Sequence, residues 1–189
     1  DGNVGVPMPL SVVSVFKPGT QEELTYNQLG EICKTGPGNM LGYDNPEATA
    51  KALQKHADGN VWLHTGDLGY MDEDGVLYVL NRGYAPRYGG GDLAVLPMEN
   101  LVANARIEGI DDEFFVLLDD DEHPGYYLPY LYVVLKDGYT VDSIREKVEE
   151  CLEEYQHPVE IIQIDKRPFF HFKTNRIGLM RELKAESAS

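Results

Sequence analysis

The sequence has few cysteines and no long apolar run. Its two cysteines, Cys33 and Cys151, stand far apart, and neither has a second cysteine or a histidine cluster at metal-ligand spacing. This argues against a disulfide framework or a zinc site and suits a reducing compartment. No run of about twenty apolar residues is present to cross a bilayer, and the first ten residues lack the regions of a signal peptide. We therefore expect a cytoplasmic protein without a membrane span.

Basic residues are the scarcer charge. The chain has 16 Lys and Arg against 32 Asp and Glu, which gives a formal net charge of -16. Such a field repels polyanions, so we expect neither nucleic acid nor an anionic membrane surface as the main partner. A nucleotide would need a local site that overrides the global charge. With 189 residues, 42% of them hydrophobic, the chain can still bury a core, as one domain or as two small ones.

Turn signals and short apolar runs predict a β-rich first part. We expect a strand and a hairpin over residues 4–19 and a short strand over residues 31–34. Asn45, Pro46 and Glu47 are typical of a helix start, and this helix should run to about Gln54. A β-rich strand is predicted over residues 76–80.

The composition changes sharply over residues 83–92, where four glycines and a proline occur in ten residues. This is the best hinge candidate, so we predict a mostly-β subdomain over residues 1–82 and a compact α+β domain over residues 83–189, joined at Gly83 and Tyr84. Beyond the hinge we expect a helix from Pro97, an amphipathic helix capped by Thr140, strands over 113–118, 130–136 and 159–164, and a short helix within 173–183. The predicted fold class is therefore α+β.

Residues 60–82 carry the most suggestive chemistry. They predict a loop bearing Asp67, then an acidic turn, then a strand that delivers Arg82. An ionised carboxylate accepts two hydrogen bonds and so suits the cis-diol of a ribose, while a guanidinium adds a rigid fork of donors. Taken alone, His-Thr-Gly-Asp is more often an ordinary turn.

The acidic run at residues 119–122 invites a metal interpretation, because hard cations take oxygen ligands. The run lacks interleaved ligands and a central glycine, so its spacing fits no such loop. We expect a solvated turn and no metal site.

Several stretches in order resemble the C-terminal part of the adenylate-forming superfamily, which contains acyl- and aryl-CoA synthetases, luciferases and peptide-synthetase adenylation domains. The resemblance covers most of the chain. It rests on residues 30–43 (GEICKTGPGNMLGY), 45–53 (NPEATAKAL), 62–67 (WLHTGD), 75–82, 89–99 and 173–183. The resemblance implies that Asp67 and Arg82 hold the ribose of ATP or AMP. The segment MLGYDNPEAT (residues 40–49), followed by WLHTGD (residues 62–67), is similar to the corresponding segments of acyl-CoA synthetases.

The resemblance also implies a two-step reaction. A carboxylic acid attacks ATP to give an acyl-adenylate and pyrophosphate, with Mg²⁺ easing the phosphate charge. The thiol of coenzyme A then displaces AMP to give the thioester. Between the steps the C-terminal domain would rotate about the hinge. Gly89, Gly90 and Gly91 would lie near the CoA pantetheine. The implied partners are a small carboxylic acid, ATP and CoA.

The family's phosphate loop, acid pocket and most of its Mg²⁺ site lie upstream of these motifs. We therefore expect the chain to be the C-terminal fragment of an AMP-forming acyl-CoA synthetase, inactive alone. Two alternatives stay open, namely a module that loads a carrier-protein thiol and a degenerate, non-catalytic relative.

Three departures from the family pattern stand out. Asn81 replaces the usual glycine before the ribose arginine, and Tyr84 replaces the usual Asp or Lys at the hinge. The family's Thr-x-x-Gly-Lys tail appears as KTNRIG over residues 173–178. Arg176 is the best match for the adenylation lysine, with Lys173 as the alternative, and arginine does not simply replace lysine at a buried point. His64 and His171 lie beside motifs and are assigned no catalytic role.

Overall fold

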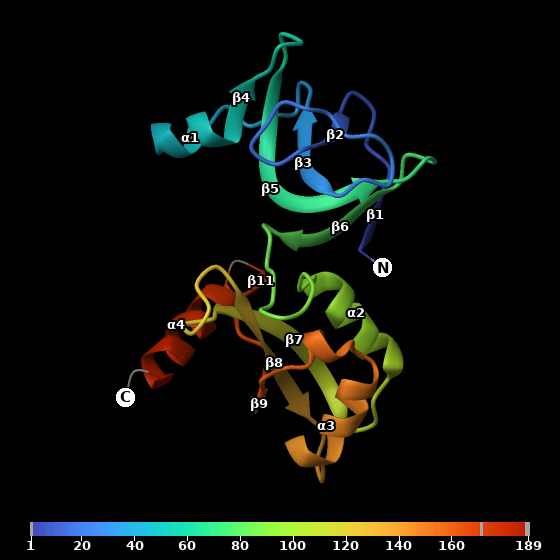
Figure 1. The fold of residues 1–189 in the computed structure, drawn as a ribbon, viewed down its shortest axis with the longest axis vertical. Coiled ribbons are helices and arrows are strands. Elements are labelled where there is room, and N and C mark those ends of the chain that lie inside the picture. Colours follow the sequence, from blue (N-terminus) through green and yellow to red (C-terminus); the bar gives the residue numbers. More distant parts are fainter. Residues whose placement is uncertain (1, 171, 188–189) are drawn as a thin grey trace. The chain divides into compact units, whose positions relative to one another are not determined.

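The computed structural model describes residues 2–170 and 172–187, so His171 lies outside the described residues. Contacts divide the chain into two compact units, of which the first ends at Tyr84 and the second begins at Ala85 (Figure 1). The first unit is mostly strand and the second combines a sheet with helices. The predicted α+β class is confirmed.

One antiparallel sheet organises the first unit. Its strand order is β1-β6-β5-β3-β2, with β4 paired to part of β5. The long strand β5 curves past its neighbours in Figure 1. The elements are β1 (Asn3–Gly5), β2 (Val12–Phe16), β3 (Gly30–Thr35), α1 (Pro46–Ala52), β4 (Leu53–Lys55), β5 (Val61–Met71) and β6 (Leu77–Arg82).

The first two strands pair with different partners, β1 with β6 and β2 with β3. The predicted hairpin forms after β2, where the chain turns at Pro18 and Gly19 and Phe16 forms an antiparallel bridge with Glu23. The helix start is confirmed, since the Asn45 Oδ1 accepts from the backbone N–H of Glu47 at 2.8 Å. The helix ends at Ala52, slightly before the predicted end, because the next residues pair with β5 as β4.

The second unit is built on a three-stranded sheet in the order β7-β8-β9, in which β7 and β8 are antiparallel and β8 and β9 are parallel. Its parallel connection passes through α3, as such crossovers require. The elements are α2 (Val95–Ala105), β7 (Ile110–Asp119), β8 (Tyr127–Leu135), α3 (Val141–Glu150), the 3-10 helix η1 (Glu154–Gln156), β9 (Glu160–Gln163), β10 (Phe169–Phe170), β11 (Lys173–Thr174) and α4 (Arg176–Ser187).

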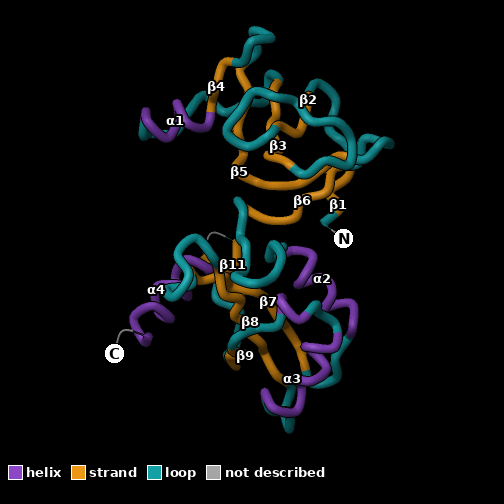
Figure 2. Tube along the Cα trace, viewed as in Figure 1, coloured by secondary structure: helices purple, strands orange, loops and turns teal. Residues whose placement is uncertain are grey.

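Helices cover both faces of this sheet (Figure 2). Successive residues of a strand point to opposite faces, and β7 follows this rule. Phe115 packs into the core formed with α2 and α3, whereas Phe114 and Val116 pack with Leu179 and Leu183 of α4. The prediction that both faces of the apolar strand β8 are covered is confirmed.

The cap of α3 is also confirmed. The Thr140 Oγ1 accepts from the Ser143 N–H, and the Ser143 Oγ accepts from the Thr140 N–H, which together form a capping box. Ile144 and Val148 are the buried residues of the helix.

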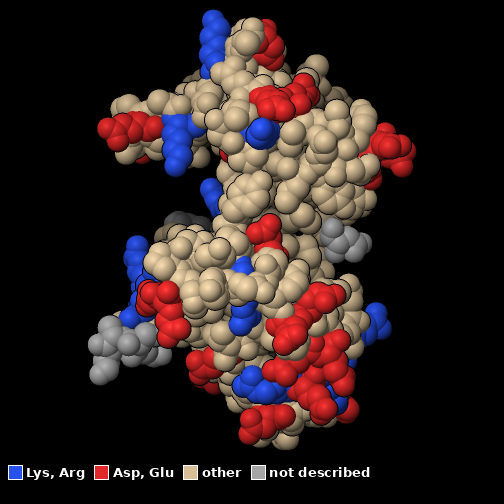
Figure 3. All heavy atoms as spheres, in the orientation of Figure 1, with Lys and Arg blue, Asp and Glu red and all other residues tan. Residues whose placement is uncertain are grey.

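Figure 3 shows acidic side chains gathered on the second unit near α2 and α3. Among the described residues, no helix has both the length and the apolar character needed to cross a membrane.

Candidate functional site

Asp67 lies within a strand, so the predicted loop is wrong. β5 runs without a break from Val61 to Met71. Glu31 and Cys33 of β3 are two residues apart, yet they pair with Leu68 and His64 of β5, which are four apart. The strand therefore carries two extra residues in a bulge, a feature that keeps the ladder intact on both sides while re-aiming side chains.

Gly66 makes the bulge possible. Its φ is +75°, a left-handed conformation that glycine adopts without steric cost. The Thr65 Oγ1 donates to the Ile32 carbonyl at 2.6 Å and accepts from the Asp67 N–H at 3.0 Å. The Thr-Gly-Asp motif is thus a bulge tied to β3, which fixes the backbone at Asp67.

Arg82 lies directly opposite Asp67. The two residues are partners in the antiparallel β5·β6 ladder, and directly opposed residues place their side chains on the same face. Asp67 is half-buried and Arg82 is exposed. Within the described part of the chain, neither charged group has a hydrogen-bond or ion-pair partner. Both charged groups are therefore available to a ligand on one face of the sheet.

A cavity of about 560 Å³ adjoins the bulge and belongs wholly to the first unit. Thr65, Gly66 and Arg82 line one part of it, and Tyr43 and Lys51 line another. The lining combines cationic groups with an aromatic ring, which suits a polar ligand with a planar or anionic part.

A buried cluster of Glu31, Cys33 and His64 is one that sequence reasoning missed. One ligand-type atom from each residue lies within 4.8 Å of the others. Burial, with the Glu31 charge as a second cause, raises the pKa of the Cys33 thiol to about 12. A metal ion at this point would have to displace the thiol proton and break the contact between Glu31 and His64. The sequence did offer one signal, because Glu31 and Cys33 lie two residues apart in a strand and so share one face. His64 is too distant along the chain for the sequence to place it beside them.

Arg176 is held inside the second unit. Its Nη2 donates to the Glu99 Oε1 at 2.7 Å and its Nε donates to the Phe115 carbonyl at 3.0 Å. The guanidinium thus has a structural role, and its assignment to adenylation stays a prediction. Lys173, the alternative, is exposed on β11.

Two of the three predicted CoA-contact glycines have a packing role. A Cβ at Gly90 would lie 2.4 Å from the Tyr155 Cβ, and one at Gly91 would lie 3.0 Å from the Tyr155 Cζ. Gly89, with φ +71°, faces open space. Arg87 fastens the same loop, since its Nη1 donates to the carbonyls of Tyr155 and His157. A contact between these glycines and pantetheine stays a prediction.

At the predicted hinge, Gly83 has φ +74° and Tyr84 is exposed. The Gly83 N–H donates to the Gly66 carbonyl at 3.0 Å, which extends the β5·β6 pairing past Arg82. The hinge function of Gly83 and Tyr84 stays a prediction.

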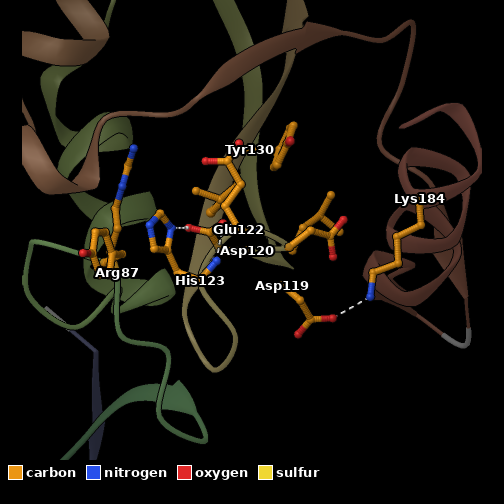
Figure 4. Close-up of a pocket in the computed structure, with 11 residues that line it drawn as sticks. Arg87, Asp119, Asp120, Glu122, His123, Tyr130 and Lys184 are labelled. Carbon is orange, nitrogen blue, oxygen red and sulfur yellow. Dashed lines mark hydrogen bonds and ion pairs between the residues drawn. The ribbon is translucent and has the colours of Figure 1, made fainter. Parts of the chain in front are cut away.

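The acidic run at residues 119–122 is not simply a solvated turn. Asp120 is only 8% exposed, and its Oδ2 lies 2.9 Å from the His123 Nδ1 in the pocket drawn in Figure 4. The hydrogen bond from His123 is the main cause that lowers the pKa of Asp120. Tyr88 stacks on the His123 ring with centroids 3.6 Å apart, and Asp119 forms an ion pair with Lys184. The expected solvated turn is therefore wrong at Asp120, because hydrogen bonds within its own turn satisfy this carboxylate away from water.

Known proteins resemble this chain over most of its length. No family model matches the chain. The 2-succinylbenzoate–CoA ligase of Geobacillus sp. (strain WCH70) is 34% identical over 177 residues, which cover 88% of this chain and 32% of that protein. The 4-coumarate–CoA ligase 5 of Oryza sativa subsp. japonica is 34% identical over 172 residues, with coverages of 88% and 30%. The chain belongs to the adenylate-forming superfamily.

Solved structures of this superfamily agree in fold. ATP-bound MatB from Rhodopseudomonas palustris matches 100% of this chain and 37% of its own, with a TM-score of 0.80 at 24% identity. The AMP complex of O-succinylbenzoate coenzyme A synthetase (MenE) from Bacillus subtilis matches 94% of this chain and 35% of its own, with a TM-score of 0.73 at 25% identity. The chain spans about a third of the length of the relatives it matches.

Proposed function

We propose that this chain supplies the ribose contacts and the mobile C-terminal domain of an AMP-forming acyl-CoA synthetase. The observation that carries the proposal is the register of β5 and β6, which sets Asp67 directly opposite Arg82, with neither charged group paired to another described residue. Relatives at 34% identity are named as CoA ligases, and a solved relative holds AMP.

In this proposal the Asp67 carboxylate accepts hydrogen bonds from the two ribose hydroxyls. Arg82, across the ladder, donates to the sugar or to a phosphate oxygen. Because both residues lie on paired strands, little conformational freedom is lost when the nucleotide binds. The pair fits a nucleotide better than it fits Mg²⁺, because a guanidinium beside a single carboxylate repels a dication.

The complete reaction is tested on the full-length protein that contains this chain. Acid-dependent ATP–pyrophosphate exchange reports adenylation, and mass spectrometry reports the CoA thioester. We expect both with at least one member of a broad carboxylic-acid panel. Acylation of a phosphopantetheinylated carrier protein without a CoA ester would instead assign the carrier as acceptor. Absence of exchange and of both thioesters across the panel contradicts the proposal.

Asp67 gives the residue-level test. We expect Asp67→Ala to lower kcat/KM for ATP by roughly 10- to 100-fold, because it removes charge-assisted hydrogen bonds to the ribose. Asp74→Ala, at an exposed carboxylate in the neighbouring turn, is the matched control and should leave kcat/KM unchanged. Equal activity of the two variants would remove Asp67 from the site.

A second candidate, a relative that binds nucleotide without adenylating an acid, is favoured by the engagement of Arg176 with Glu99 and Phe115. The two half-reactions separate the candidates. AMP binding that depends on Asp67, with neither pyrophosphate exchange nor thioester formation from a supplied acyl-adenylate, would support the binding module. Exchange by the full-length protein would exclude it.

A further inference from the structure

The Glu31 carboxylate bridges the two ends of the β5 bulge. Its Oε1 accepts from the Gly66 N–H at 3.1 Å, and its Oε2 lies 3.0 Å from the His64 Nδ1. The side chain of Glu31 is 16% exposed and that of His64 is 7% exposed. A carboxylate has enough lone pairs to serve both partners at once, so one side chain of β3 holds the turn on both sides of Thr65.

A second histidine stands behind this contact. The His64 Nε2 lies 2.9 Å from the His56 Nε2. Because the His64 Nδ1 faces a carboxylate, we place its proton on Nδ1, which leaves Nε2 to accept from His56. His56 is 6% exposed, and its ring meets the Phe16 ring edge-on with centroids 4.9 Å apart. The chain from His56 through His64 to Glu31 is therefore anchored in the core of the first unit.

Among the described residues, Glu31 is the acceptor that the structure gives for the Gly66 N–H. Gly66 borders the 560 Å³ cavity together with Glu31 and His64, and its own carbonyl is engaged by Gly83. Thr65 ties the bulge to β3 on one side of Gly66, and without the Glu31 carboxylate the Gly66 N–H itself would lose its acceptor. Asp67 is the next residue along the chain.

We propose that Glu31 is a positioning residue of the nucleotide site, which holds the bulge so that Asp67 faces Arg82. The inference rests on the proposed function, because the ligand it serves is the ribose of that site. In this proposal Glu31 acts through the backbone of Gly66, from whose N–H it accepts a hydrogen bond. His64, which also contacts His56, engages the Oε2 of Glu31 and leaves the Oε1 for the Gly66 N–H.

The experiment uses the 189-residue chain with AMP as the probe, followed by NMR. Long-range ¹H–¹⁵N spectra report the tautomer of His64, amide exchange reports the Gly66 N–H, and the shifts of Gly66 and Asp67 report AMP binding. For Glu31→Ala we expect loss of the Nδ1–H tautomer signature, at least about tenfold faster Gly66 exchange and about tenfold weaker AMP binding, since a charge-assisted hydrogen bond is lost. Trp62 fluorescence verifies that the unit remains folded.

Glu31→Gln serves as the conservative variant. Its amide oxygen can still accept from Gly66, while its NH₂ group must face the His64 Nδ1 and drive the proton to Nε2. We therefore expect a switched His64 tautomer with AMP affinity restored to within about threefold of the unaltered chain, because the bond that positions the bulge remains. Glu22→Ala, at an exposed ion pair with Lys17 in the same unit, should change none of these readouts.

The possible outcomes are distinct. If the unaltered chain binds AMP and Glu31→Ala binds it equally well with unchanged Gly66 exchange, the positioning role is overturned. Asp67→Asn should weaken AMP binding while the His64 tautomer stays unchanged, which separates ligand contact from positioning. If the full-length protein does not bind AMP but Glu31→Ala still alters the Gly66 and Asp67 signals of the 189-residue chain, the proposed function fails and the control of the bulge by Glu31 stands.

Discussion

Arg176 and Glu99 together complete the backbone hydrogen bonding of Phe115. Glu99 accepts from the Phe115 N–H at 2.8 Å, Arg176 donates to the Phe115 carbonyl at 3.0 Å, and the two side chains join each other at 2.7 Å. β7 is an edge strand of its sheet. An ion pair from α2 and α4 thus takes the place of a missing strand at this residue, which protects an edge that would otherwise pair with another chain.

We expect Glu99→Ala to destabilise the second unit by about 1–3 kcal/mol, because it leaves the buried Phe115 N–H and the Arg176 guanidinium without their acceptor. Urea unfolding followed by far-UV circular dichroism measures the effect. The single tryptophan, Trp62, belongs to the first unit, so its fluorescence transition should stay in place. Glu149→Ala, which removes only a surface pair with Arg145, should cost less than about 0.5 kcal/mol. Equal losses in the two variants would contradict the edge-closing role.

Glu113 should make stability fall as pH rises. Burial, followed by the nearby Asp112 charge, raises the pKa of Glu113 to about 7 from its ordinary value of 4.5. Between these values the folded chain keeps a proton that the unfolded chain has lost, so the stabilisation is present at pH 4.5 and is lost as pH rises through 7. We expect Glu113→Gln to be more stable than the unaltered chain at pH 8, by about 1 kcal/mol after allowance for solvent screening, and equal to it at pH 4. Urea titrations at both pH values, with the exposed Glu146→Gln as control, measure this difference; a constant difference would contradict it.

Gly66→Ala should separate backbone strain from ligand binding. Gly66 and Gly75 have φ values of +75° and +78°, and neither has an atom within 4 Å of an added Cβ. Each alanine variant should therefore lose about 1 kcal/mol of stability from left-handed strain. Only Gly66→Ala should also weaken AMP binding, because Gly75 lies in the turn beyond the site. Calorimetry with AMP on both variants is the measurement, and parallel losses of affinity would show that general destabilisation is responsible.

Gly90→Ala should be more damaging than Gly89→Ala. A Cβ at Gly90 meets the Tyr155 Cβ at 2.4 Å, whereas one at Gly89 meets nothing and only incurs the cost of φ +71°. We expect losses of about 1–3 kcal/mol for overpacking at Gly90 and of about 1 kcal/mol for strain at Gly89. Thermal unfolding of the second unit compares them. The reverse order would mean that the loop does not rest on Tyr155.

The sequence was sufficient where local chemistry decides structure. Asn45 and Thr140 cap their helices because a side-chain oxygen at each position accepts from backbone N–H groups of the first turn. The unbroken apolar run of β8 likewise predicted a strand covered on both faces. The motif order led to the family, and Asp67 and Arg82 were named from it. The structure adds that the two residues are direct partners across β5 and β6.

The features that the sequence did not predict depend on pairing between segments that are distant along the chain. The segment at Asp67 looks like a turn because Thr-Gly-Asp is turn chemistry, yet tertiary pairing with β3 and β6 absorbs it as a bulge. The cluster of Glu31, His56 and His64 forms only after β3 and β5 are aligned. In the same way, the residues near Arg176 in the sequence do not predict that its guanidinium donates to Glu99 and Phe115.

The segment that links the two units is short, because both of its ends are held by backbone hydrogen bonds. Gly83 is bonded to Gly66 on one side, and the Ala85 carbonyl accepts from the Leu93 N–H on the other. Only Tyr84 lies between these two bonded residues. A hinge at Gly83 and Tyr84, as predicted, would therefore work by rotation about a few dihedral angles and not by the extension of a long flexible linker.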